Sequence, residues 1–175
     1  MKNEFETLTL YADPPWNETG GGKIKRGADR HYNLLKTKDI INFKIPICVN
    51  GHLYLWVTNT FLKDGLKVME SWGYTYKTNL VWAKNKFGLG QYFRGQHEIL
   101  LFGTKGKLPY KVIDGKRQQH PTVIIANREI HSKKPSIFYE IIEKVSYPIY
   151  YELFARGKRK NWIQEGDQLL DNENV

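Results

Sequence analysis

The chain has 175 residues, 41% of them hydrophobic, and its 27 Lys and Arg against 18 Asp and Glu give a formal net charge of +9. A single cysteine, Cys48, excludes a disulfide framework and a multi-cysteine zinc site, and no apolar run approaches the roughly 20 residues of a membrane span. The polar start MKNEFET is not that of a signal peptide, so we expect one cytoplasmic domain, residues 1–175, with a polyanionic partner.

The hydrophobic pattern predicts strands and helices in alternation. Period-2 alternation predicts a first strand over 5–12, and an unbroken apolar run predicts a buried strand over 52–57. Helical spacing predicts one helix over 60–73, capped by Gly73, and another over 134–145, with Pro135 at its start. Further strands are predicted over 77–84, 97–106, 122–127 and 147–156, and residues 167–175 are expected to form a frayed acidic tail. This alternation favours an α/β sheet with ligands at the carboxyl ends of its strands.

Several familiar motifs are absent. The GGGK run at 20–23 is no phosphate-binding loop, because Asn17 stands where that motif has its first glycine and Ile24 where it has Ser or Thr. GLGQYFRG, at 88–95, carries Phe93 in place of the third glycine of a dinucleotide fingerprint. The five histidines have no zinc-site spacing, so we expect no metal site.

The first predicted strand ends in the corner Asp13-Pro14-Pro15-Trp16. Two consecutive prolines fix the backbone and remove two N–H donors, which leaves two carbonyls that need partners elsewhere. An acceptor-rich corner beside an indole suits a ligand with an amino group on a flat ring, as in a flipped nucleobase. The alternative is a plain Pro-Pro turn with Trp16 packed into the core.

The corner resembles the signature of amino-group methyltransferases that act on nucleic acid. More narrowly, the chain looks like the adenine-methylating family of the mRNA adenosine methyltransferases and their small bacterial and phage relatives. Four further segments match that family in order: HYNLL (31–35), GQYFRGQHEILLFGTKG (90–106), HSKKPSIFYEIIE (131–143) and YYELFARGKRKNWIQEGDQL (150–169).

The resemblance implies a Rossmann-like methyltransferase sheet with helices on both faces, in permuted order: the catalytic strand first and the cofactor strand, Tyr150–Arg156, last. It implies S-adenosylmethionine as the cofactor, with Lys134 on its methionine carboxylate; a cation at a helix start suits that anion. The family acidic residue that holds the cofactor's adenine lies well upstream of the corner. Only twelve residues precede Asp13, so we expect this contact to be missing or made differently. The other residues implied to bind the cofactor are Asp13, Phe154, Arg156, Asp167 and Gln168.

The implied reaction is methyl transfer to the exocyclic N6 amino group of adenine. The Asp13 carboxylate and the Pro14 carbonyl would accept the amino hydrogens and favour the charge that develops on nitrogen. Pro15 and Trp16 complete the catalytic set, and Trp16 would stack on the base. The candidate substrate-binding residues are Tyr32, Glu98, Lys23, Lys25, Arg26 and Arg94.

Cations cluster in loops that we expect to surround this pocket, with Tyr92 and Phe93 among them. Besides those already named, they are Arg30, Lys84, Lys86, Lys116, Arg117, Lys158, Arg159 and Lys160. DNA is favoured over RNA as the substrate. Two other functions stay open, a catalytically silent partner subunit and a plain basic nucleic-acid-binding module. The expected protein partners are a second copy of the chain, in a homodimer, or a related subunit, in a heterodimer.

Overall fold

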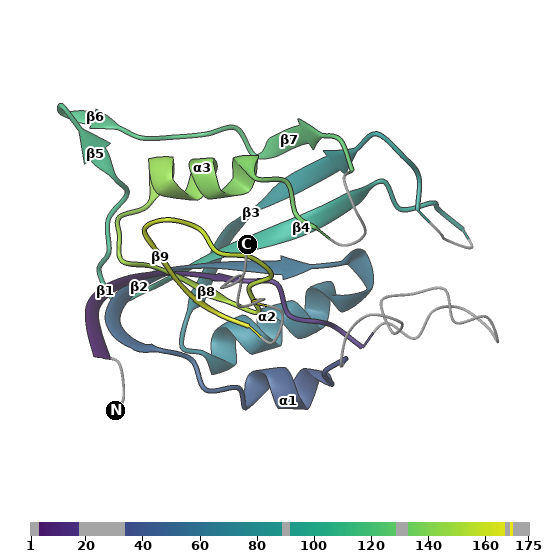
Figure 1. Ribbon diagram of the computed structural model, residues 1–175, viewed down its shortest axis with the longest axis horizontal. Helices are drawn as coiled ribbons and strands as arrows, with labels where there is room; N and C mark the ends of the chain where they lie inside the picture. The colour runs from purple at the N-terminus through teal and green to yellow at the C-terminus, as the bar shows by residue number, and fades with distance from the viewer. Residues whose placement is uncertain (1–3, 18–33, 89–91, 129–132, 167–168, 170–175) are drawn as a thin grey trace, which may run out of the picture.

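Seven strands form one sheet in the order β7-β3-β4-β2-β1-β8-β9 (Figure 1). The structure is a computed structural model that describes residues 4–17, 34–88, 92–128, 133–166 and 169. The strands of the sheet are β1 (Glu4–Ala12), β2 (Ile47–Val57), β3 (Thr75–Lys84), β4 (His97–Lys105), β7 (Val123–Ala126), β8 (Tyr150–Leu153) and β9 (Trp162–Glu165). A separate hairpin pairs β5 (Val112–Ile113) with β6 (Lys116–Arg117).

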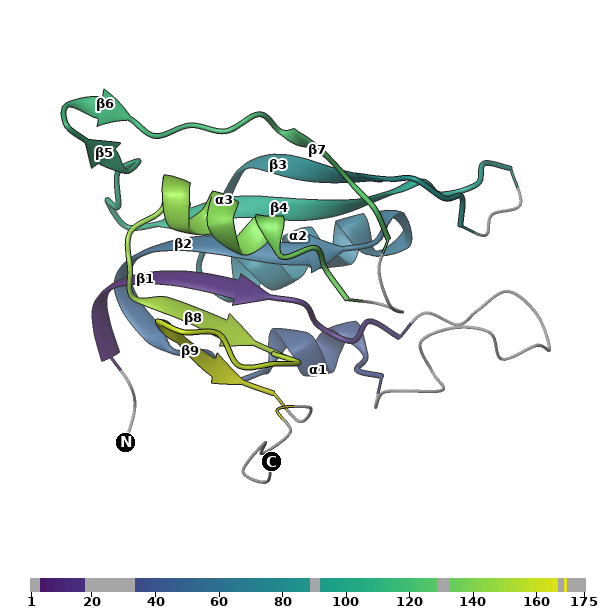
Figure 2. The same ribbon diagram turned by 45° about the horizontal axis from the view of Figure 1, so that its top comes forward.

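Helices cover both faces of the sheet, as Figure 2 shows. On one face lie α1 (Thr37–Ile41) and α2 (Leu62–Ser71), the latter preceded by a single 3-10 turn, η2 (Asn59–Phe61). The other face is covered by α3 (Ile137–Val145). None of the helices in the described ranges is long and apolar enough to cross a membrane.

Side-chain alternation along the strands divides the core into two layers. On β1, Leu8 and Leu10 pack in the layer of α1 and α2, whereas Tyr11 packs in the layer of α3. Helix α2 lies so close to β2 that a Cβ added at Gly65 would come within 2.3 Å of Val57 Cγ1. This close packing explains a glycine within the predicted helix, where it costs helix propensity.

Strand β4 is antiparallel to both of its neighbours in the sheet. It pairs antiparallel with β2 and with β3, whereas the pairs β1–β2, β1–β8, β8–β9 and β3–β7 are parallel. The amino end of β4 therefore lies at the same edge of the sheet as the carboxyl ends of the other strands. We call this edge the carboxyl edge.

The fold class predicted from the sequence is confirmed: a mixed α/β sheet with helices on both faces, consistent with a Rossmann-like methyltransferase. Gly73 follows α2 with a φ of +81°, as a helix-ending glycine does. One detail of the predicted order is wrong. The strand predicted to be last ends at Leu153, and β9 follows it and pairs parallel to it.

Candidate active site

The proline corner continues directly from the carboxyl end of β1. The N–H of Trp16 donates to the carbonyl of Pro14 at 2.9 Å, and the N–H of Leu35 donates to the carbonyl of Pro15 at 2.9 Å. Both proline carbonyls thus have backbone partners within the fold. Because a carbonyl oxygen has two lone pairs, Pro14 can still accept one more hydrogen bond.

Trp16 is buried, which corrects the expectation that it stacks on a base. Its side chain is 5% exposed and lies stacked on Phe61, with ring centroids 5.3 Å apart. Its indole N–H donates to the carbonyl of Trp56 at 2.9 Å. A side chain this buried has no open face for a base. Trp16 is therefore packed into the core, as the alternative interpretation of the corner predicted. Trp16 anchors the corner to β2.

The carboxylate of Asp13 meets Lys134, the residue that precedes Pro135 and α3. Lys134 Nζ lies 2.8 Å from both carboxylate oxygens of Asp13 and 3.3 Å from Oε2 of Glu98. Glu98 in turn forms a short ion pair with Lys84, at the end of β3. Four charged groups of alternating sign therefore line the carboxyl edge, and we call them the charge chain.

The antiparallel direction of β4 explains how Glu98 reaches this site. Glu98 is the second residue of β4 and pairs in register with Trp82 of β3. Had β4 run parallel to its neighbours, this carboxylate would lie at the opposite edge. The structure thus brings Glu98 to Asp13 and Lys134, as the wall of a shared site.

The charge chain is little exposed, with side chains of Lys134, Asp13 and Glu98 exposed by 12%, 15% and 18%. Burial by itself lowers the pKa of Lys134, but the charges of Asp13 and Glu98 outweigh it and raise this pKa above its usual value. Burial by itself raises the pKa of Glu98, but Lys134 and Lys84 outweigh it and hold this pKa below its usual value. The ionised forms therefore stabilise one another.

Two of the cofactor-binding candidates follow β8 at the same edge. Arg156 Nη2 lies 3.4 Å from Oδ2 of Asp13, so a second cation contacts the carboxylate. Phe154 has a φ of +62°, and its ring centroid lies 4.7 Å from that of Phe43. Asp13, Lys134, Arg156 and Phe154 thus gather around the ends of β1 and β8.

A second layer beneath the charge chain was missed by sequence reasoning. Lys134 Nζ lies 5.2 Å from the ring of Trp56, whose indole N–H donates to the hydroxyl of Tyr11 at 2.7 Å. Deeper on the same face, the buried Glu152 accepts hydrogen bonds from Tyr139 (2.8 Å) and from Gln164 (2.6 Å). The sequence does contain a signal for this layer, the glutamate within the apolar run YYELF. A charged residue in a buried strand needs polar partners, so its presence indicates a buried hydrogen-bond network.

The hydroxyl of Thr58 lies one residue past the end of β2. Among the described residues, its Oγ1 is the one buried side-chain N or O atom without a hydrogen-bond partner. Buried polar groups in folded proteins are nearly always paired. This unpaired hydroxyl at the carboxyl edge is compatible with a site that receives a ligand.

Other predicted residues are placed apart from the charge chain. Arg94 lies in the turn between β3 and β4, where it donates to the carbonyl of Gly88 at 3.1 Å. In the same turn Tyr92 and Phe93 are each 92% exposed, as expected of side chains that could stack on bases. The predictions for Tyr32, Lys23, Lys25, Arg26, Arg30, Asp167, Gln168 and the acidic tail concern residues outside the described ranges, apart from Leu169 of the tail.

The expectation that the cations lie mainly in loops around one pocket is wrong for two of the predicted groups. Lys84, Lys86 and Arg94 lie at the carboxyl edge, at the end of β3 and in the turn after it. By contrast, Lys116 and Arg117 form β6, whose hairpin lies at the far end of the molecule (Figure 1). Lys158, Arg159 and Lys160 line a pocket beside Tyr150, the first residue of β8.

Comparison with known proteins gives a consistent result. The family model MT-A70 matches residues 9–168. The chain is 30% identical to the type II methyltransferase M.MunI of a Mycoplasma, over 94% of this chain and 78% of that protein. It is 27% identical to a probable N(6)-adenosine-methyltransferase MT-A70-like protein of rice, over 91% of this chain and 22% of the relative. It is 29% identical to the human N(6)-adenosine-methyltransferase catalytic subunit METTL3, over 91% of this chain and 28% of that protein.

Proposed function

The chain belongs to the MT-A70 family of methyltransferases, and on this premise we propose that it methylates the exocyclic N6 amino group of adenine in nucleic acid. The proposed methyl donor is S-adenosylmethionine, and DNA is the favoured substrate. The observation that carries the proposal is the intact Asp13-Pro14-Pro15-Trp16 corner, whose carboxylate is held by the little-exposed Lys134 at the carboxyl edge. The relatives whose names specify adenosine N6 support the choice of adenine.

The residues at the carboxyl edge suit the charged groups of S-adenosylmethionine, which are a carboxylate, an ammonium and a sulfonium. Lys134 would hold the methionine carboxylate, and Asp13 offers a carboxylate to the positive charges of the cofactor. Thr58 adds an unpaired hydroxyl at the same edge. When bound, the cofactor supplies a methyl group on a sulfonium, which is already activated for transfer.

The residues of the corner act on the target amino group. The Asp13 carboxylate and the second lone pair of the Pro14 carbonyl would accept its two hydrogens. These acceptors favour the positive charge that develops on nitrogen over the flat, conjugated ground state. Lys134 and Arg156 contact the carboxylate, so that it is oriented before the substrate arrives.

The exposed turn between β3 and β4 supports a nucleic-acid substrate. Tyr92 and Phe93 offer open aromatic faces, and the guanidinium of Arg94 lies 5.5 Å from the ring of Phe87. Cations and aromatic side chains on one projecting turn are typical of surfaces that contact phosphates and bases. The preference for DNA rests on a composition rich in Lys, Asn and Ile, which is compatible with an AT-rich genome.

The proposal is tested by incubating the protein with labelled S-adenosylmethionine and matched pools of DNA and RNA, followed by nucleoside mass spectrometry. The expected product is N6-methyladenine, formed in DNA more than in RNA and absent with Asp13→Ala. Cofactor binding without methylated product would favour the silent partner subunit. Nucleic-acid binding with no cofactor binding would favour the plain basic module.

A further inference from the structure

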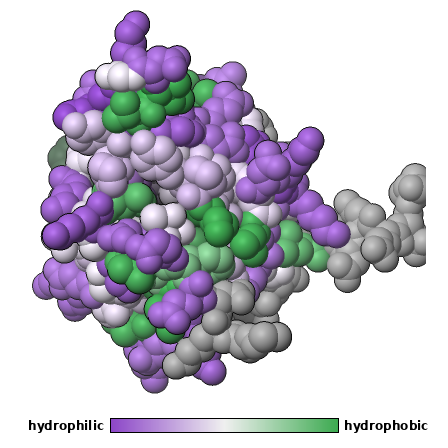
Figure 3. Space-filling view, turned by 90° about the vertical axis from the view of Figure 1, so that its left-hand side faces the viewer, coloured by the Kyte–Doolittle hydropathy of each residue, from purple (hydrophilic) through white to green (hydrophobic). Residues whose placement is uncertain are grey.

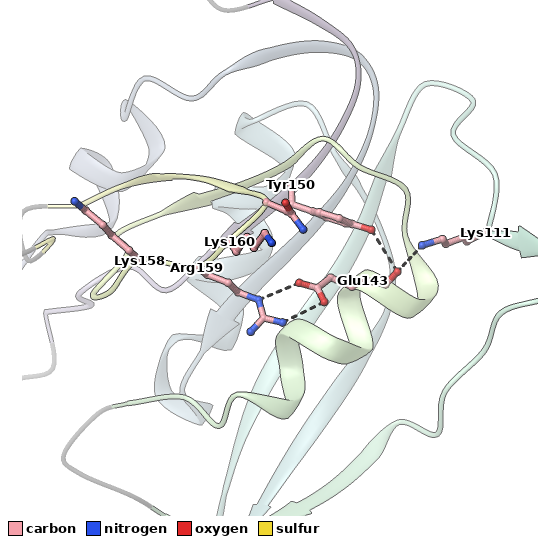
Figure 4. A pocket seen from close by; sticks show the side chains of 7 residues that line it. Lys111, Glu143, Tyr150, Lys158, Arg159 and Lys160 are labelled. Atoms are coloured by element: carbon pink, nitrogen blue, oxygen red, sulfur yellow. Dashed lines mark hydrogen bonds and ion pairs between the residues drawn. The ribbon is translucent and has the colours of Figure 1, made fainter.

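A basic pocket lies on the α3 face of the sheet. It has a volume of about 630 Å³ and is lined by Lys111, Glu143, Tyr150 and the segment 158–161 (Figure 4). Its walls are the last turns of α3, the start of β8 and the connection between β8 and β9. Figure 3 shows the end of the molecule where β1 begins. The surface at this end is mostly hydrophilic, with smaller apolar patches.

The pocket has an excess of positive charge. Four cationic side chains and one carboxylate line it, so its formal net charge is +3 (four minus one). Arg159 is paired with Glu143, and Lys111 Nζ donates to the main-chain carbonyl of Glu143 at 2.6 Å. Lys158 and Lys160 are exposed, and within the described residues neither side chain has an ion pair or hydrogen bond. Two cations are therefore free to bind an anion.

The framework between these two lysines is fixed. Nε and Nη2 of Arg159 donate to the two carboxylate oxygens of Glu143 at 2.9 and 3.1 Å. The indole N–H of Trp162 donates to the same carboxylate at 2.7 Å, and the Arg159 guanidinium lies 4.7 Å from the ring of Tyr139. Lys158 and Lys160 thus flank a residue whose side chain is held by Glu143 and by the ring of Tyr139.

The pocket lies on the same face as Asp13. Tyr150 is paired with Thr9, which precedes Asp13 by four positions, and the side chains of alternate residues point to one face. At about 3.3 Å per strand residue the two sites are roughly 13 Å apart along the strands. A duplex rises about 3.4 Å per base pair along each strand, so this distance corresponds to about four base pairs.

We propose that this pocket binds the phosphate backbone of the nucleic-acid substrate, about four nucleotides from the target base. The inference rests on the proposed function and adds a second contact to it, remote from the chemistry. Lys158 and Lys160 neutralise the phosphates, while the Arg159–Glu143 pair keeps the connection in position. A phosphate group is also present in free nucleotides, and the test separates the two sources.

The experiment compares Lys158→Ala/Lys160→Ala with a matched control, Lys63→Ala/Lys67→Ala, which removes two exposed lysines from α2 on the opposite face. Binding of labelled adenine-containing duplexes is measured between about 50 and 200 mM salt, with flanks of about two or about eight base pairs beyond the target. The salt slope is the steepness with which the logarithm of the affinity falls with the logarithm of the salt concentration, and loss of two phosphate contacts lowers it by up to about 1.8. The ratio of the affinity at low salt to that at high salt is then roughly tenfold smaller in the pocket variant than in the wild type. The wild type and the control gain affinity from the longer flank, whereas the pocket variant does not.

The outcomes separate this proposal from the proposed function. Equal salt slopes for the two double variants, with wild-type methylation intact, would overturn the phosphate pocket alone. A wild type that neither binds nor methylates nucleic acid would overturn both. If inorganic phosphate or a mononucleotide competes as effectively as a long duplex does, the pocket binds free phosphates, and the proposed backbone contact is overturned. In the supporting result, cofactor binding by calorimetry is unchanged in the pocket variant.

Discussion

Lys134 Nζ lies equidistant, at 2.8 Å, from the two carboxylate oxygens of Asp13, although 121 positions separate the two residues in the chain. The ion pair joins the end of β1 to the segment that leads into α3, and Glu98 extends it to β4. A ligand at this edge has to share these charges with the protein.

Asp13→Ala is expected to abolish methylation while the protein stays folded. The carboxylate is one of two acceptors for the amino hydrogens, and loss of one such preorganised group typically costs about 10²–10³ in rate. Glu98 still pairs with Lys134 in the variant. The single-turnover rate is measured beside the melting temperature, with Asp114→Ala, an exposed aspartate of the β5–β6 turn, as control. Turnover near that of the wild type would rule out the corner as the catalytic group.

Lys134→Ala is expected to weaken binding of S-adenosylmethionine. A hydrogen bond to a charged group contributes about 1.5–3 kcal/mol, or roughly 10- to 150-fold in affinity. Calorimetry with the cofactor measures the loss. Lys144→Ala, which removes an exposed lysine near the end of α3, is the matched control. If Lys134→Ala binds the cofactor as tightly as Lys144→Ala does, the carboxylate of the cofactor lies elsewhere.

Trp16→Ala is expected to destabilise the protein by about 3–5 kcal/mol, as is usual when a buried aromatic side chain is removed. Trp16→Phe keeps most of the packing on Phe61 and loses the hydrogen bond to Trp56, so a loss of about 1 kcal/mol is expected. Urea unfolding of both variants gives these values. A fully stable Trp16→Ala with poor substrate binding would instead restore the base-stacking role.

Glu152→Gln is expected to change how stability depends on pH. Burial raises the pKa of Glu152 above the usual 4.5, although hydrogen bonds from Tyr139 and Gln164 act in the opposite direction. A carboxyl group whose pKa is higher in the folded state contributes stability below its unfolded pKa and loses it as pH rises through the folded pKa. Glutamine stays neutral, so the melting temperature of the variant relative to the wild type should rise as the pH increases from the unfolded pKa of Glu152 through its raised folded pKa.

The comparison for this last prediction is Glu140→Gln, an exposed glutamate on α3. Its melting temperature should follow that of the wild type over the same range. A Glu152→Gln difference that does not vary with pH would contradict the raised pKa.

Local sequence was enough to predict β1, β2 and the cap at Gly73, because apolar periodicity and glycine conformations are properties of short segments. The position of Glu98 could not be predicted in this way. It depends on the direction of β4, which strand pairing over the whole sheet decides. The burial of Trp16 escaped prediction for a related reason. An indole serves equally well in a core or on a binding surface. The contact between Trp16 and Phe61 depends on the tertiary structure, which the local sequence does not determine.

The central place of β1 also has a consequence for the order in which the protein is completed during synthesis. β1 precedes the other strands of this sheet in the chain, yet it lies between β2 and β8, and β8 begins only at Tyr150. Until then one side of β1 has unpaired backbone groups, and the carboxylate of Asp13 awaits Lys134. A nascent chain halted before residue 134 would have a nearly complete half-sheet on the β7 side and no assembled charge chain. Its exposed strand edge would be open to pairing with other chains.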